Sequence, residues 1–111
     1  MTPMARTLAY LREQGFVAEV VERRVPGCPI TKDFLGFADV LAIHPARAGV
    51  LAVQTTTRAH QAHRLAKVQA SGYLSLWLAT GNAAHIHGWA LVGKRGTRKT
   101  WQVTVQEIGA P

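Results

Sequence analysis

Two stretches decide the fold: KDFLGFADVLAI at residues 32–43 and VLAVQTT at residues 50–56. The first places an acid, Asp39, at the head of an apolar strand, and the second is an apolar strand that ends in Gln54-Thr55-Thr56. Neighbouring strands that carry polar side chains at adjacent tips can hold a divalent cation against a phosphate group. The chain has only six acidic residues, and both Asp33 and Asp39 fall in the first stretch. A metal site is therefore predicted here.

Length and composition set the frame for this site. A chain of 111 residues with 48% apolar and 17% charged residues is predicted to form one globular domain over residues 1–111. No apolar run approaches the roughly 20 residues of a membrane helix, and no secretory signal is recognisable, so we expect a cytoplasmic protein without membrane contact. A single cysteine, Cys28, permits neither an internal disulfide nor a cysteine-rich zinc site.

The charge indicates a polyanionic partner. Thirteen lysines and arginines against six acids give a net charge of +7, and nucleic acid is the partner such a chain most often has. A merely basic surface and an acidic protein partner are the alternatives. The candidate DNA-binding residues are Lys32, Arg58, His60, Arg64, Lys67, Lys94, Arg95, Arg98 and Lys99.

Periodicity and turn signals predict the order α-β-β-β-α-β-β-β. The first helix is capped by Thr2 and stopped by Gly15, and the second begins after one of the threonines at 55–57 and runs to about Ala70. The predicted strands cover residues 16–25, 37–43, 50–54, 73–79, 85–92 and 100–106. This order implies a mixed sheet with helices packed on it and a parallel crossover through the second helix. The three tryptophans fall on predicted strands and are expected in the core.

This order and its motifs resemble the PD-(D/E)XK nuclease superfamily, and in particular small phage proteins described as Holliday-junction-resolvase-like endonucleases. The matching segments are Glu22 on the first strand, DFLGFADVLAI at 33–43, LAVQTTTRAHQAHRLAKV at 51–68 and WLATGNAAHIHGWALVGKRGTRKTWQV at 77–103. The resemblance implies a restriction-endonuclease-like α/β domain with a mixed sheet flanked by helices. It also implies Mg²⁺ or Mn²⁺ as cofactor and hydrolysis of phosphodiester bonds in duplex or branched DNA. Because junction resolvases need two active sites, it leaves a homodimer open.

The resemblance further assigns roles to residues. Asp39 falls on the metal-binding Asp of that superfamily, and Gln54-Thr55-Thr56 falls on its acid-x-Lys motif, from which the chain departs. Gln54 offers an uncharged amide oxygen, and Thr56 offers no cation. The expected catalytic set is Glu22, Asp39, Gln54 and Thr56, and the expected metal ligands are Asp39, Asp33 and Glu22. Lys32 is the candidate for charge stabilisation of the leaving group.

Plainer interpretations stay open for these residues. Glu22 can pair with neighbouring arginines on the surface, Asp33 can cap a turn, and Gln54 can satisfy backbone groups. Loss of the acid-x-Lys motif also fits a catalytically inactive DNA-binding module of the same fold. A third possibility is a basic protein that inhibits another protein.

Overall fold

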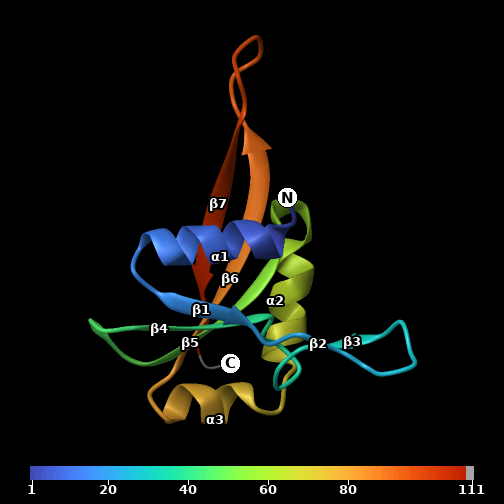
Figure 1. Cartoon of the computed structure of the whole chain (residues 1–111), viewed down its shortest axis with the longest axis vertical. Helices are drawn as coiled ribbons and strands as arrows, with labels where there is room; N and C mark the ends of the chain where they lie inside the picture. The colour runs from blue at the N-terminus through green and yellow to red at the C-terminus, as the bar shows by residue number, and fades with distance from the viewer. Residues whose placement is uncertain (110–111) are drawn as a thin grey trace.

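The computed structural model describes residues 1–109. A mixed five-stranded sheet in the order β1-β4-β5-β6-β7 crosses the molecule, and a two-stranded hairpin, β2–β3, projects beside it (Figure 1). The elements are α1 (Pro3–Glu13), β1 (Val17–Val20), β2 (Arg23–Arg24), β3 (Thr31–Lys32), β4 (Val40–His44), β5 (Arg47–Thr57), the 3₁₀ turn η1 (Arg58–His60), α2 (Gln61–Gln69), α3 (Leu74–Ala79), β6 (Ala83–Val92) and β7 (Thr100–Glu107). The predicted α/β class with a mixed sheet is confirmed.

The first helix begins and ends as the sequence predicts. Ala5 N donates a hydrogen bond to the Thr2 hydroxyl at 3.1 Å, and Pro3 occupies the first turn. Gly15 follows the helix at a φ of +92°, a conformation that glycine adopts without strain. The helix is therefore fixed at both ends before it packs on the sheet.

Helices cover both faces of the sheet, and each face has its own apolar core. Under α1 the core is Leu11, Ala18, Val40, Ala42, Leu51 and Val53. On the opposite face, under α2 and α3, it is Phe37, Ala38, Ala52, Val68, Leu74, Ala84, Ile86 and Ile108. Alternate residues of β5 point to the two faces, so Leu51 and Val53 face α1 while Ala52 and, by the same alternation, Gln54 face α2.

The connection from β5 to β6 is a parallel crossover, as predicted after the third strand, but it passes through α2 and α3 and leads to β6 rather than to a strand at 73–79. The two strands pair in parallel from Leu51 beside Ala83 to Thr57 beside Trp89. A Cβ on Gly88 would lie 3.3 Å from Arg58 Cα and closer still to the Gln61 side chain, so glycine allows the start of the helical segment to lie tightly on β6. Within residues 1–109, no helix has the length and apolar character needed to cross a membrane.

The predicted fourth strand at 73–79 is wrong, because this segment forms α3. Leu74 is buried and Leu78 half-buried one turn later, while Leu76 between them is 65% exposed, which is helical rather than alternating burial. A short apolar run does not distinguish a strand from a helix by periodicity, and leucine and alanine favour the helix. The predicted order α-β-β-β-α-β-β-β is therefore wrong, and the observed order is α-β-β-β-β-β-α-α-β-β, with the 3₁₀ turn η1 before α2.

Other strands also differ from their predicted bounds, and β5 is longer than its predicted 50–54, because it runs from Arg47 to Thr57. The segment predicted as one strand at 16–25 divides into β1 and β2, and β2 leaves the sheet to pair with β3. The strand predicted from residue 37 begins only at Val40, so Asp39 lies just before β4, where its N–H donates to the Val53 carbonyl at 2.9 Å. This division matters for the site, because it places Glu22 and Asp39 in irregular segments beside each other.

Candidate metal and phosphate site

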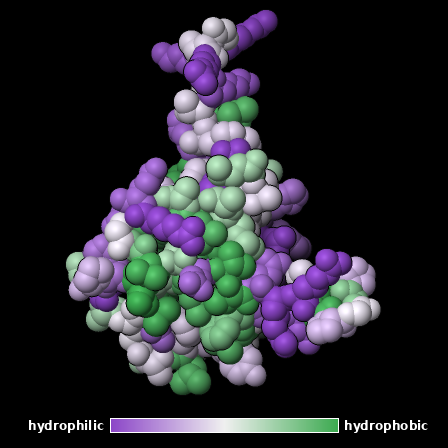
Figure 2. Space-filling view, viewed as in Figure 1, coloured by the Kyte–Doolittle hydropathy of each residue, from purple (hydrophilic) through white to green (hydrophobic). Residues whose placement is uncertain are grey.

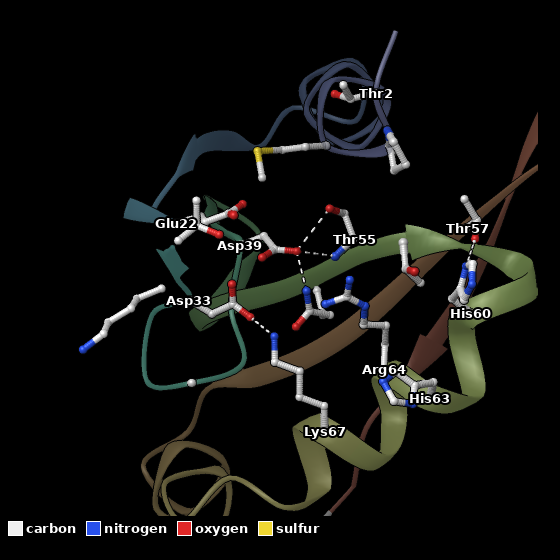
Figure 3. Close-up of a pocket in the computed structure, with 17 residues that line it drawn as sticks. Thr2, Glu22, Asp33, Asp39, Thr55, Thr57, His60, His63, Arg64 and Lys67 are labelled. Atoms are coloured by element: carbon white, nitrogen blue, oxygen red, sulfur yellow. Dashed lines mark hydrogen bonds and ion pairs between the residues drawn. The ribbon is translucent and has the colours of Figure 1, made fainter. Parts of the chain in front are cut away.

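A cavity of about 770 Å³ opens where β5 ends, between the start of α1, the helix α2 and the β2–β3 hairpin (Figure 3). All four predicted catalytic residues line it: Glu22, Asp39, Gln54 and Thr56. Asp33 and Lys32 line it as well. The structure therefore gathers in one place residues that are up to 34 positions apart in the chain.

Three carboxylates converge in this cavity. Glu22, Asp33 and Asp39 each place an oxygen so that all three atoms lie within 4.8 Å of one another, and Figure 3 shows their side chains turned together. Glu22 is held there because the N–H groups of Val21 and Glu22 both donate to the Asp39 carbonyl, at 2.8 and 3.3 Å. The three residues predicted as metal ligands thus form one acidic cluster.

A tight turn brings Asp33 to Asp39. Phe34 and Ala38 exchange two backbone hydrogen bonds, of 2.8 and 3.0 Å, and the chain reverses between them through Leu35 and Gly36. Both turn residues have positive φ, +54° for Leu35 and +79° for Gly36. A left-handed leucine is unfavourable outside such a turn, so its presence indicates that the surrounding contacts enforce this conformation.

The Asp39 side chain is fixed by the end of β5. One carboxylate oxygen, Oδ2, accepts hydrogen bonds from Gln54 Nε2 at 2.5 Å, Thr55 N at 2.9 Å and Thr55 Oγ1 at 3.2 Å. Burial raises the pKa of Asp39 to about 7; the backbone N–H of Thr55 opposes this shift, and the neighbouring Asp33 and Glu22 add to it. The second oxygen, Oδ1, takes no part in these three bonds.

Gln54 has an amide oxygen that lacks a protein partner. The side chain is 2% exposed and spends its N–H on Asp39, while its Oε1 is buried and accepts no hydrogen bond within the described chain. An unpaired buried carbonyl oxygen is costly, and a hard cation is one group that satisfies it. Gln54 therefore has one neutral oxygen donor to offer a ligand beside Asp39.

The cavity wall formed by η1 and α2 carries basic residues. His60 at the end of η1 and His63, Arg64 and Lys67 on α2 line it at spacings of three or four residues, which is one face of a helix. Lys67 forms an ion pair with Asp33 (Figure 3). Lys67 was predicted only as a DNA contact; the helical spacing from His60 through His63 and Arg64 was the signal that it belongs to the site.

The remaining predicted DNA-binding residues lie outside the cavity. Arg58 is exposed on η1. Lys94, Arg95, Arg98 and Lys99 are exposed at the tip of the long β6–β7 hairpin, which projects from the body (Figure 1) and forms a hydrophilic end (Figure 2). The predicted contact residues thus divide into a group around the cavity and a group at the hairpin tip.

Two histidines of β6, His85 and His87, lie apart from this site. His87 is buried against α1, where its Nδ1 lies 3.2 Å from the Thr7 hydroxyl and its ring makes an edge contact with Tyr10. Burial lowers the pKa of His87 to about 4. This histidine is thus a neutral member of the core near neutral pH.

The chain matches no protein-family model, no curated protein and no solved structure. Three carboxylates and an orphaned amide oxygen are all hard oxygen ligands, which suit Mg²⁺ or Mn²⁺ rather than a thiophilic metal. The residues present fit such a cation.

The raised pKa of Asp39 predicts a pH-dependent stability. The unfolded carboxyl group titrates near 3.8, whereas the folded one keeps its proton to about 7. Between these values the folded state binds more protons, so the free energy of unfolding falls with rising pH, by at most about 1.4 kcal/mol per pH unit for this group. We expect Asp39→Asn to gain stability relative to wild type as the pH rises, in urea unfolding with EDTA at about pH 5 and about pH 8. If wild type and Asp39→Asn differed in unfolding free energy by the same amount at both pH values, the raised pKa of Asp39 would be contradicted.

Proposed function

We propose that this chain is a metal-dependent endonuclease that binds DNA and hydrolyses its phosphodiester bonds. One observation carries the proposal: the acidic cluster and Gln54 share a cavity with two cations of α2, Arg64 and Lys67. Hard-cation ligands beside basic side chains are the groups that metal-dependent phosphodiester hydrolysis uses. The resemblance to PD-(D/E)XK nucleases supports the restriction-endonuclease-like version of the fold and a preference for branched DNA.

The residues of the cavity divide the work between them. Glu22, Asp33 and Asp39 would hold Mg²⁺ with Gln54, and the ion would polarise the phosphate and supply an activated water. Gln54 and Thr55 orient Asp39 through one oxygen and leave the other for ligation. Arg64 and Lys67 stand on the phosphate side, where positive charge stabilises the negative charge that develops on the reacting group.

A catalytically inactive DNA-binding module is the second candidate. Gln54 brings no negative charge, and Thr56, which is buried beside it, brings no cation. A phosphate could then be held by α2 alone, without chemistry. The basic hairpin tip and the cationic helix face serve DNA binding under either function.

Metal binding should depend on Asp39. Asp39→Asn removes one charged ligand while keeping the side-chain volume, so we expect Mn²⁺ binding by isothermal titration to be lost or weakened at least about 100-fold. Glu13→Gln is the matched control, because it removes one acid from an exposed position of α1 away from the cavity. Absence of any heat with millimolar Mn²⁺ for wild type would remove the main support for catalysis.

The altered motif separates the two candidates. If Gln54 is a working ligand, wild type should cut DNA with Mn²⁺ and Gln54→Ala should not. If the chemistry has been lost, wild type should be inactive, and Gln54→Glu combined with Thr56→Lys should create activity by adding the missing carboxylate and cation. The measurement is a cleavage assay on four-way junction, flap and linear duplex. Inactivity of wild type and of the double variant on every substrate would contradict the nuclease origin of the site.

DNA binding should be strongly dependent on salt. Each phosphate contact contributes about 0.9 to the slope of log affinity against log salt on B-DNA, so Arg64→Ala should lower affinity for every sequence and reduce that slope by about one. Arg47→Ala is the control, because Arg47 begins β5 at the end opposite the cavity. Fluorescence anisotropy over a salt series measures both quantities, and an affinity that does not change with salt would refute phosphate contact.

A further inference from the structure

The last strand of the sheet, β7, has a free outer edge. It pairs with β6 on one side only and is the final strand in the sheet order. Ile108 N donates to the Ala84 carbonyl at 2.8 Å, which continues the β6–β7 register by one pair. Since hydrogen-bonded residues alternate in an antiparallel pair, the even residues of β7 bond to β6. The backbone groups of Trp101, Val103, Val105 and Glu107 therefore point outward.

This edge lacks the usual protection against pairing. Edge strands are commonly interrupted by proline, bulges or charges. The segment TWQVTVQE contains no proline and one charged residue, and its register with β6 is continuous. Trp101 is 46% exposed and Val105 39% exposed on the α1 side. The prediction of a core position for Trp101 is thus wrong, although the Arg6 guanidinium lies 3.8 Å from the centre of its ring.

We propose that a second copy of this chain pairs antiparallel with β7, so that the two sheets join into one. The outward N–H and C=O groups of one copy must face those of the other copy. Odd-numbered residues of β7 in one copy therefore pair with odd-numbered residues of β7 in the other. Nearly full overlap of the two strands then leaves two registers, centred on Val103 or on Thr104. This inference rests on the edge alone and does not depend on the proposed nuclease function.

The register centred on Val103 is self-complementary. It places Trp101 opposite Val105 of the second copy, an aromatic and β-branched pair of the favourable kind, and Val103 opposite itself. It also places Lys99 opposite Glu107 at both ends. Lys99 lies one residue before β7, next to the last pair of the β6–β7 ladder, Val92 with Thr100. The register centred on Thr104 would instead set Trp101 against Glu107.

The charges along the edge fit a second copy of the same strand. Each copy has a net charge of +7 and four cations at its hairpin tip, which opposes association unless the two tips lie apart. Antiparallel pairing sends the two tips to opposite ends of the joined sheet, so they do not face each other. At each end Lys99 of one copy meets the single acid of β7 in the other, and the polar residues Thr100, Gln102, Thr104 and Gln106 share the opposite face. In this register each residue of β7 in one copy thus lies opposite a compatible residue of β7 in the other copy.

A charge exchange tests the pairing and its register. Sedimentation equilibrium up to about 1 mM should show a dimer, and Lys99→Glu or Glu107→Lys alone should weaken it at least about tenfold, because each replaces two ion pairs with two like-charge pairs. The double variant should restore dimerisation. Within one chain the two residues are about 27 Å apart, so rescue can arise only between copies. Glu19→Lys, an exposed change on β1, is the control.

A proline variant separates pairing from folding. The Val103 N–H points outward, so Val103→Pro removes a donor at the two-fold axis and no β6 hydrogen bond. We expect a monomer with unchanged circular dichroism, whereas Thr104→Pro should disturb the β6–β7 hairpin itself. A wild type that stays monomeric to about 1 mM, a dimer that survives Val103→Pro, or a charge exchange without rescue would each overturn the proposal.

Discussion

Three hydrogen bonds gather on one oxygen of Asp39 and join two parts of the chain that the site requires, the turn at 33–39 and the end of β5. The backbone adds to this junction, because Asp39 donates to Val53 and its carbonyl accepts from Val21 and Glu22. Every acid of the cluster is thereby positioned through Asp39. Glu22 is held by the Asp39 carbonyl, and Asp33 is returned to it by the left-handed turn at Leu35 and Gly36.

The same junction brings three acidic side chains close together, which is electrostatically unfavourable. Asp39 is 4% exposed and lies beside two other carboxylates, so its ionised form is disfavoured in the folded chain. Lys67 neutralises Asp33 from α2, yet the Gln54 oxygen has no partner among residues 1–109. A fold whose local choices otherwise agree retains such a conflict most often at a functional site. A bound cation would resolve both the excess of negative charge and the orphaned oxygen.

Much of this arrangement could be predicted because it follows from local pattern. Two apolar strands with polar ends are enough to bring Asp39 and Gln54 together, and a capped helix beside them explains α1. Other features depend on tertiary contacts that single-sequence patterns do not contain. The segment 73–79 is apolar enough for either a strand or a helix, and only its packing under the sheet decides for α3. Trp101 reads as a core residue, yet it lies on an edge strand whose position is set by sheet order.

The position of Lys67 bears on the departure from the acid-x-Lys motif. Gln54 and Thr56 are alternate residues of β5 and face the same side of the sheet, toward α2. A lysine at position 56 would therefore enter the space into which Lys67 already brings its ammonium group from the helix. With the positive charge supplied from α2, a small hydroxyl side chain at position 56 is compatible with a working site. The missing carboxylate at Gln54 is therefore a stronger argument for inactivity than the missing motif lysine at Thr56.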